Sequence, residues 1–316
     1  MSEKQKGIVI KSTGNLYHVR GEDRGIITCT LKGQFRIHGI KTTNPIAVGD
    51  HVLFIKEPQQ PHGLICDIEE RKNYITRKSI NLSRISHILA ANIDSFFLIV
   101  SISNPRTPLG FIDRFLTAAE SFRIESTLVF NKTDVYSEED FELLEKLQRL
   151  YRGIGYTCLS VSALSKEGLD ALQSCMQDKV SFFGGQSGVG KSTIINALDS
   201  NLQLTVGNLS EYYKKGKHTT TFAEMFELAF GGNIIDSPGI KEFGLIEYTR
   251  EEVTHYFPEM LRLLPFCKFK NCTHTHEPQC AVKEAVEKGE IAASRYRNYI
   301  SIIDNEDIDI KDWMLK

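Results

Sequence analysis

Residues 181–193 read SFFGGQSGVGKST, and this stretch decides the fold. It begins as a short apolar strand, passes through a glycine-rich turn from Gly185 to Gly190, and continues into a helical pattern from Lys191. Residues 185–192 match G-x-x-x-x-G-K-[ST], a phosphate loop that joins a buried strand to a helix. Its glycines let backbone N–H groups turn towards an anion, which the helix N-terminus also stabilises. The stretch therefore predicts a nucleoside triphosphate site in an α/β sheet.

The same motif assigns roles to its members. We expect Lys191 to reach the β- and γ-phosphates and the Ser192 hydroxyl to bind Mg²⁺. The other positions would surround the phosphates, chiefly with main-chain donors. These positions are Gly185, Gln186, Ser187, Gly188, Val189, Gly190 and Thr193.

A second apolar strand, Thr127–Phe130, runs into Asn131-Lys132-Thr133-Asp134. The Asp134 carboxylate could accept both guanine N1–H and the 2-amino group, a pair of donors that adenine lacks. Asn131 would brace the loop, and the stem of Lys132 would cover the base. Alone, the motif is weak, because Asp134 could equally cap a helix. Next to a strand and a phosphate loop, it indicates a guanine site.

Two further segments complete the predicted site. Ser162 and Ala163 follow the strand Thr157–Val161 and resemble the small-residue loop that places a backbone N–H on guanine O6. Asp236 ends another strand, where a ligand to a Mg²⁺-bound water belongs, and the Gly239 N–H would contact the γ-phosphate.

Residues 217–221 read KHTTT and lie between the phosphate loop and Asp236. We expect one threonine to complete the Mg²⁺ shell, with Thr220 the first choice and Thr219 the second. The start of an ordinary strand would also explain the run.

The order of these elements is unusual. The base loop comes first, and the small-residue loop, phosphate loop, threonine segment and Asp-x-x-Gly element follow. A domain whose termini lie close together tolerates such a rearrangement. The sequence therefore predicts a circularly permuted GTPase domain whose last switch leads directly into the C-terminal region.

One position departs from Ras-like enzymes, in which a Gln after the Asp-x-x-Gly glycine orients the attacking water. Here that position is Ile240, which can neither orient nor polarise water. His218 is the nearest candidate in sequence, although a loop histidine can also be surface filler. Lys191, Thr220 and His218 are thus the expected catalytic groups. Turnover without a partner is expected to be slow, below about one per minute.

Residues 1–72 show short alternating segments separated by turn residues, which indicates a five-stranded OB-type barrel. The segments are Gly7–Ile10, Leu16–Val19, Gly25–Thr30, Gln34–Ile37, Asp50–Phe54 and Gly63–Asp67. Residues 1–90 carry 14 Lys/Arg against 8 Asp/Glu, whereas the rest carries 24 against 32. This imbalance favours a polyanion partner for the barrel. A solvated face and a barrel used only for packing are the alternatives.

Strands and helices alternate after a basic linker at 73–92, so residues 73–245 are expected to form the doubly wound GTPase domain. The remaining strands are Ser95–Ser101, Val180–Phe183 and Gly232–Asp236, and the helices are Phe111–Phe122, Ser137–Tyr151, Leu169–Asp178 and Lys191–Leu198. Residues 246–316 are expected to be mostly helical.

Residues 267–280 read CKFKNCTHTHEPQC and offer Cys267, Cys272 and Cys280 with two histidines. Three thiols and one imidazole form a closed tetrahedral set suited to structural Zn²⁺. His274 and His276 both fit the spacing, and chance clustering of free thiols is the alternative. Residues 294–299, SRYRNY, fit either RNA contact or packing on this module.

Composition and hydropathy predict an ordinary cytoplasmic chain with no membrane partner, which we expect to be a monomer. Charged residues make up 25% and apolar residues 41% of the 316. The N-terminus lacks the apolar run of a secretory signal, and the most apolar segment, Phe96–Val100, is too short to span a bilayer.

Taken together, the chain resembles the RsgA (YjeQ/YloQ) family of bacterial small ribosomal subunit biogenesis GTPases, essentially from end to end. The residues that carry the resemblance are NKTD at Asn131, GQSGVGKST at Gly185, KHTTT at Lys217, DSPGIKEFGL at Asp236, CKFKNCTHTHEPQCAV at Cys267, and the segment Ser294–Tyr299. The resemblance implies an OB barrel, a permuted GTPase domain and a zinc-bearing helical domain. It also favours His274 over His276 as a ligand and His218 as the catalytic histidine.

For function, the resemblance implies GTP hydrolysis that the 30S subunit stimulates late in its maturation, coupled to release, with 16S rRNA as the polyanion. One alternative is an RNA-binding module that uses the nucleotide as a structural ligand, which Lys191, Ser192 and Asp236 argue against. Another is a permuted GTPase that acts on tRNA or at a membrane.

Overall fold

The computed structural model describes residues 3–31, 45–56, 60–78, 86–202, 223–236 and 248–304. It divides into two compact units. The first contains Met1–Phe96, Asp170–Phe183 and Ser192–Ile240, and the second contains Phe97–Leu169, Gly184–Lys191 and Lys241–Lys316. The expected strand at Gln34–Ile37 and the segments 217–221 and 237–240 lie outside the described residues.

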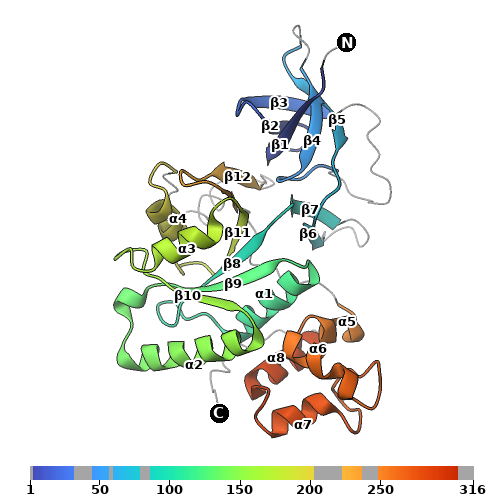
Figure 1. The fold of residues 1–316 in the computed structure, drawn as a ribbon, viewed down its shortest axis with the longest axis vertical. Coiled ribbons are helices and arrows are strands. Elements are labelled where there is room, and N and C mark those ends of the chain that lie inside the picture. Colours follow the sequence, from blue (N-terminus) through green and yellow to red (C-terminus); the bar gives the residue numbers. More distant parts are fainter. Residues whose placement is uncertain are drawn as a thin grey trace, which may run out of the picture. The chain divides into compact units, whose positions relative to one another are not determined.

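The N-terminal strands close into a five-stranded barrel, as the sequence predicts (Figure 1). The strands are β1 (Gln5–Ser12), β2 (Tyr17–Gly21), β3 (Ile26–Leu31), β4 (His51–Ile55) and β5 (Gly63–Ile68). β1 pairs with both β2 and β4, and the circuit closes through β2–β3, β3–β5 and β5–β4. Alternate residues face inward, among them the fully buried Val9, Val19 and Phe54.

The basic linker contains a two-stranded ribbon that the sequence analysis did not predict. β6 (Tyr74–Lys78) pairs with β7 (Ser86–Ala91) in antiparallel register. A buried ion pair fixes the chain to the barrel just before the linker, because Arg71 donates to both carboxylate oxygens of Asp50 at 2.6 and 2.7 Å. Gly49 adopts a φ of 93°, and a Cβ there would lie 2.0 Å from the Ala91 carbonyl oxygen. Only glycine therefore permits this close approach.

The first unit also contains part of the α/β sheet. β11 (Val180–Gly184) and β13 (Asn233–Asp236) are parallel, and β12 (Glu224–Glu227) runs antiparallel to β13. The other edge of β12 pairs with β1 of the barrel, with Lys11 opposite Glu224. Helices α3 (Leu169–Met176) and α4 (Lys191–Leu198) follow the expected pattern.

The second unit contains the strands and helices that lead into the predicted base loop. They are β8 (Ser95–Val100), α1 (Leu109–Ser121), β9 (Glu125–Phe130), the 3-10 turn η1 (Thr133–Val135), α2 (Glu138–Ile154) and β10 (Thr157–Ser160). β9 and β10 are parallel. Ser137 and Asp140 form a capping box that fixes where α2 begins.

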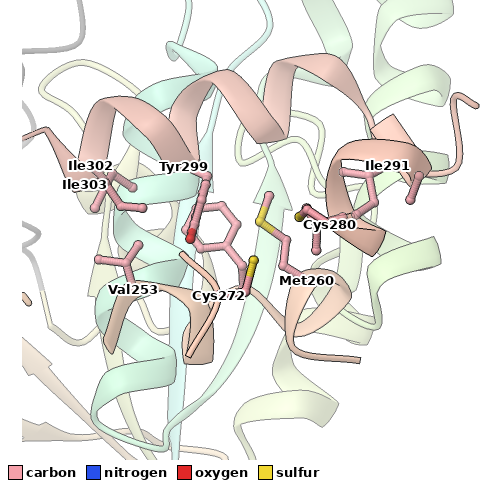
Figure 2. Close-up of a cluster of buried hydrophobic side chains, with 11 residues drawn as sticks. Val253, Met260, Cys272, Cys280, Ile291, Tyr299, Ile302 and Ile303 are labelled. Atoms are coloured by element: carbon pink, nitrogen blue, oxygen red, sulfur yellow. The ribbon is translucent and has the colours of Figure 1, made fainter. Parts of the chain in front are cut away.

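The C-terminal part of this unit is mostly helical, as predicted. Its elements are α5 (Arg250–His255), α6 (Pro258–Leu263), η3 (Leu264–Phe266), α7 (Ala281–Glu287) and α8 (Ala293–Ile303). Figure 2 shows their shared core, in which Tyr299 of α8 lies among Met260, Cys272 and Cys280. Tyr299 and Arg295 are buried, so this half of the 294–299 segment packs within the module.

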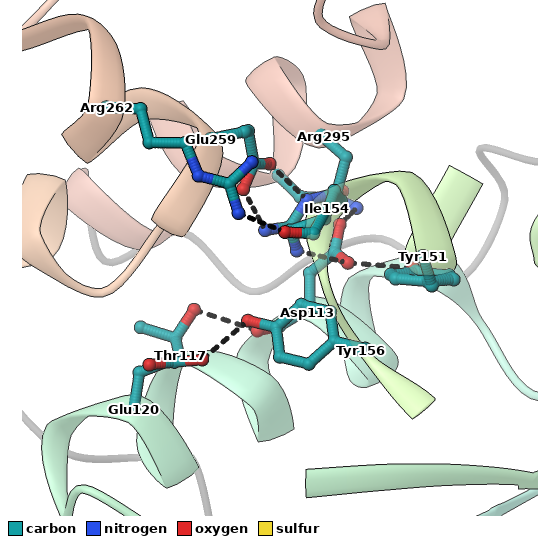
Figure 3. A network of polar contacts seen from close by, with 10 residues as sticks. Asp113, Thr117, Glu120, Tyr151, Ile154, Tyr156, Glu259, Arg262 and Arg295 are labelled. Atoms are coloured by element: carbon teal, nitrogen blue, oxygen red, sulfur yellow. Dashed lines mark hydrogen bonds and ion pairs between the residues drawn. The ribbon is translucent and has the colours of Figure 1, made fainter. Parts of the chain in front are cut away.

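A buried polar network joins the helical module to α1 and α2 (Figure 3). Arg295 of α8 donates to Asp113 of α1 at 2.7 Å and to Glu259 of α6 at 2.7 and 3.1 Å. Tyr151 of α2 donates to the same Asp113 at 2.8 Å. The guanidinium is 1% exposed and lies 4.4 Å from the Phe257 ring centroid. This pairing satisfies a charge that would otherwise be costly to bury.

None of the helices in the described ranges is long and apolar enough to cross a membrane.

Candidate nucleotide and metal sites

The phosphate loop joins β11 to α4 and has the backbone shape that its glycines predict. Gly185, Gly188 and Gly190 have φ values of 144°, 83° and 96°. A Cβ on Gly185 would lie 2.6 Å from the carbonyl oxygen of Ile99, and one on Gly190 would lie 2.4 Å from Asn131 Nδ2. Side chains are therefore excluded at these two positions, and the backbone N–H groups are left to face an anion.

Lys191 and Ser192 begin α4 at the end of this loop. The Lys191 ammonium donates to the carbonyl oxygens of Gly185 and Gln186, both at 2.7 Å, so the side chain folds back over the loop. Ser192 is 8% exposed. Of the remaining loop positions, Val189 is buried, whereas Ser187 and Gly188 are exposed.

Asn131 ties three loops together. Its Nδ2 atom donates to the carbonyl oxygen of Val189 in the phosphate loop at 2.8 Å. Its Oδ1 atom accepts from the Ala163 N–H in the small-residue loop at 3.2 Å. The side chain is 1% exposed, so both bonds are sheltered from water. The structure thus brings the base loop, the small-residue loop and the phosphate loop to one place.

The rest of the base loop presents a carboxylate to solvent. Asp134 is exposed, and Ser162 donates to its Oδ1 at 2.6 Å, which fixes the orientation of the carboxylate. Lys132 adopts a left-handed conformation with φ of 72°, and its ammonium donates to the carbonyl oxygen of Asn104. Burial lowers the pKa of Lys132. Thr133 is half-buried in the turn η1.

The sequence analysis missed a fourth loop, residues 101–108 after β8, at this site. A Cβ on Gly188 would meet Pro105 Cδ at 3.4 Å, and the Asn104 carbonyl oxygen accepts from Lys132. Reciprocal bonds between Ser101 and Thr107 close the loop. An Asn-Pro turn directly after a fully buried strand was the available signal, because neighbouring strands deliver their loops to one sheet edge.

Besides Ser192, the structure describes only one of the predicted magnesium and switch residues, the backbone of Asp236 at the end of β13. β13 pairs with β11, the strand that leads into the phosphate loop. Lys217, His218, Thr219, Thr220 and Gly239 lie outside the described residues.

The helical module gathers four candidate metal ligands. The ligand atoms of Cys267, Cys272, His274 and Cys280 all lie within 4.8 Å of one another. His274 Nδ1 faces the thiols, at 3.6 Å from Cys267 Sγ and 3.3 Å from Cys280 Sγ. His276 is exposed and bonds Thr275 instead, so the structure selects His274 for the cluster.

The chemistry of this donor set fits a metal ion. Burial lowers the pKa of His274 to about 4, so its ring is neutral near pH 7 and can offer a lone pair. Burial also raises the pKa of the Cys272 thiol to about 12, and only a bound cation would readily favour its thiolate form. Glu277 accepts hydrogen bonds from Thr273 and Thr275 at 2.7 to 3.0 Å and thereby shapes the ligand loop.

Comparison with known proteins shows which family has this architecture. A family profile described as RsgA GTPase matches residues 68–246, and one described as RsgA N-terminal domain matches residues 6–65. The chain belongs to the RsgA GTPase family. It is accordingly a GTP hydrolase with a circularly permuted GTPase domain.

Relatives and solved structures cover nearly the whole chain. The small ribosomal subunit biogenesis GTPase RsgA 2 of Bacteroides thetaiotaomicron is 49% identical, over 96% of this chain and 97% of its own length. RsgA of Flavobacterium johnsoniae is 50% identical, over 95% and 93%. YjeQ from Thermotoga maritima superposes with a TM-score of 0.78 at 34% identity, covering 96% of this chain and 98% of its own. YloQ, described as a circularly permuted GTPase, gives 0.74 at 28%, covering 96% and 95%.

Proposed function

We propose that this RsgA-family enzyme binds the small (30S) ribosomal subunit late in its maturation, and that the subunit stimulates GTP hydrolysis, which is coupled to release. The hydrogen bonds of Asn131 support the GTPase part of this proposal, because one buried amide joins the base loop to the phosphate loop. The names of the chain's relatives, small ribosomal subunit biogenesis GTPases, support the ribosomal partner.

For the nucleotide, we propose that Asp134 reads guanine N1–H and the 2-amino group while the stem of Lys132 covers the base. The Ala163 N–H, which donates to Asn131 Oδ1 at a long 3.2 Å, would share its hydrogen with guanine O6. The loop from Gly185 to Thr193 would hold the phosphates. The Lys191 ammonium would exchange its bonds to the loop carbonyls for phosphate oxygens. This exchange gives the lysine a satisfied position both with and without nucleotide.

For the metal in the nucleotide site, we propose Mg²⁺ held by Ser192 and the phosphates, with Thr220 or Thr219 and Asp236 completing its shell. His218 would orient the attacking water in place of the glutamine that Ras-like enzymes use. For the helical module, we propose structural Zn²⁺ bound by the four-ligand cluster. Three thiols and one imidazole leave no open coordination position, so this metal would stabilise the module.

For the partner, we propose that 16S rRNA meets the basic N-terminal region and that the protein acts as a monomer in the cytoplasm. The charge imbalance of residues 1–90 supports an RNA partner. We place the barrel at 1–72, the GTPase domain at 73–245 with its linker at 73–92, and the helical zinc domain at 246–316.

The deciding experiment measures GTP turnover at physiological salt with no partner, with 30S subunits, with 50S subunits and with tRNA. We expect strong stimulation by 30S alone, and loss of turnover in Lys191→Ala. Turnover that persists in Lys191→Ala would contradict the phosphate-loop assignment. Equal stimulation by 30S and tRNA, with GTP binding intact, would contradict the proposed partner and leave the GTP site standing.

A further inference from the structure

Tyr136 occupies a break between two neighbouring strands, β8 and β9. The Asn131 N–H donates to the Val100 carbonyl oxygen at 2.8 Å, which is the last direct rung between them. A parallel ladder would continue with a bond from the Ile102 N–H to the Asn131 carbonyl oxygen. Instead, the Tyr136 hydroxyl lies between these groups. It accepts from Ile102 N at 2.9 Å and donates to Asn131 O at 2.6 Å.

The hydroxyl therefore does for this rung what an inserted water would do, but from a fixed position. A hydroxyl can donate and accept at once, so it satisfies both main-chain groups that the missing rung would leave unpaired. Burial raises the pKa of Tyr136, so the phenol keeps the proton that it donates. One hydroxyl thus holds two strand ends apart by the width of an oxygen atom.

The Tyr136 side chain is held by its backbone and by a neighbouring ring. Tyr136 ends the turn η1, and the next residue, Ser137, caps α2 through its bond to Asp140. The ring of Phe141 meets the Tyr136 ring edge-on, with centroids 5.7 Å apart. Because backbone and ring are both fixed, the hydroxyl is pre-organised in the gap.

The two strand ends that Tyr136 separates lead into two loops of the nucleotide site. Ile102 leads into the loop whose Pro105 lies against Gly188, and whose Asn104 accepts from Lys132. Asn131 opens the base loop and donates to the phosphate loop through its own side chain. The width of the gap therefore sets how far the base loop lies from the loop beside the phosphates.

We propose that Tyr136 is a positioning residue for guanine selectivity, whose hydroxyl holds strands β8 and β9 apart so that the Asp134 carboxylate meets both the N1–H and the 2-amino group of the base. Tyr136 does not touch the nucleotide. It acts through the main chain of Asn131, three residues before Asp134. The inference rests on the proposed role of the base loop.

The test compares the affinities of fluorescently labelled GDP and IDP for Tyr136→Phe and for the unmodified protein. IDP lacks the 2-amino group, so it reports on the base loop with only one of the two contacts to Asp134. We expect GDP affinity to fall by about five- to tenfold. The fold-change in IDP affinity should be about half of that or smaller. The GDP-to-IDP preference should therefore narrow, whereas a general loss of structure would lower both affinities alike.

Tyr156→Phe is the matched control. It also removes a hydroxyl from a buried tyrosine of the same unit, one that donates to Glu120 at 3.0 Å, away from the base loop. We expect its GDP-to-IDP preference to be unchanged. An unchanged preference in Tyr136→Phe, or equal losses for both nucleotides, would overturn the inference.

A separate arm tests the base loop on which the inference rests. In Asp134→Asn, an amide donor replaces one acceptor, so binding should shift from guanine towards xanthine, which offers an oxygen at position 2. If Asp134→Asn leaves guanine preference intact, the base-loop assignment fails. If Asp134→Asn shifts the preference and Tyr136→Phe does not, only the role of Tyr136 fails.

Discussion

Asn131 shows why an amide, and not a carboxylate, suits the junction of the three loops. It faces a carbonyl oxygen of Val189 on one side and the N–H of Ala163 on the other. An amide donates and accepts with one planar group, whereas an aspartate would point an oxygen at the Val189 carbonyl. With 1% exposure, such a mismatch would leave a buried acceptor unsatisfied. The residue type follows from the two partners.

Glu120 is a carboxylate whose environment works against its charge. Burial raises its pKa above the ordinary value of 4.5, the hydrogen bond from Tyr156 and the nearby Arg295 oppose this shift, and Glu259 adds to it. A raised pKa in the folded state means that ionised Glu120 destabilises the protein. The cost is present above the folded-state pKa and disappears as the pH falls towards 4.5.

We therefore predict that Glu120→Gln raises the free energy of unfolding at pH 7 by on the order of 0.5 kcal/mol. The thermal unfolding midpoint should rise accordingly. The amide oxygen can still accept from Tyr156, so the charge is the main change. Thermal unfolding of both proteins from pH 7.5 to 4.5 should show the gain shrinking as the pH falls. Glu125→Gln, an exposed glutamate in the same unit, serves as the control. A gain that grows towards low pH would contradict the argument.

Helix α8 is held against α1 by charge as well as by apolar packing. Arg295 is 1% exposed and pairs with carboxylates from two other helices, Asp113 of α1 and Glu259 of α6. Asn298, one turn along α8, donates to the second oxygen of Asp113 at 2.5 Å. Removing the cation would leave two carboxylates in a closed site, which is far more costly than never having buried them.

We predict that Arg295→Met lowers the free energy of unfolding by about 3 to 5 kcal/mol. Arg297→Met is the matched control, because it changes the same residue type on the same helix at an exposed position, and its effect should stay within about 0.5 kcal/mol. Chemical denaturation gives both values. Adding Glu259→Gln to Arg295→Met should cost less than the sum of the two single changes, since the partner charge is then absent. Additive losses would show that the network does not act as a unit.

Elements with a strong local pattern were predictable from the sequence. Helix α4, predicted at Lys191–Leu198, begins and ends there, and α2 (Glu138–Ile154) overlaps the predicted Ser137–Tyr151 because a capping box and apolar spacing mark it. The ribbon β6–β7 was missed, since its two short strands, YITRK and SHILAA, lack a clear alternation of apolar and polar residues. The short β12 was missed as well. Its four residues form a strand because they pair with β1 and β13, and not because of local propensity.

The same distinction applies to the site. Motif residues such as Asn131 and Cys267 were found because their chemistry depends on fixed spacing. Tyr136 and the 101–108 loop were not found as site elements, because they act through main-chain groups of other strands. Such contacts arise only when distant strands meet, as when the Ile102 N–H reaches the Tyr136 hydroxyl. Arg295 likewise gained its role from partners 36 and 182 residues away in sequence.

At the scale of the whole molecule, the permuted order places β12 in a connecting position. Along the chain it lies between the threonine segment and Asp236, the two parts expected to respond to the γ-phosphate. In space it forms an edge pair with β1 of the barrel. Three ion pairs reinforce this edge. Lys11 pairs with Glu224 at 2.8 Å, and Glu227 pairs with Arg20 at 3.0 Å and with Arg24 at 3.5 Å. The barrel is thus fastened to the strand between the two switch segments.

This connection makes a prediction about stimulation by the ribosomal subunit. In the double variant Glu224→Gln and Glu227→Gln, the barrel keeps every cation that could bind RNA but loses all three ion pairs to β12. We expect subunit-stimulated turnover to fall by about two- to fivefold, since exposed ion pairs contribute about 0.2 to 1 kcal/mol each. Turnover without the subunit should be unchanged, because neither carboxylate belongs to the nucleotide site. Affinity for the subunit should not fall, because the variant removes only negative charge beside the barrel.

The control is Glu69→Gln, which removes an exposed ion pair of the same barrel, from Lys6 to Glu69 at 3.0 Å, away from β12. It should leave stimulation unaltered. Steady-state turnover at saturating subunit separates the two variants, and a binding assay at the same salt checks occupancy. If the double variant lost affinity for the subunit instead of stimulation, β12 would only place the barrel for binding. If it lost neither, this edge would not carry the signal from the barrel to the GTPase site.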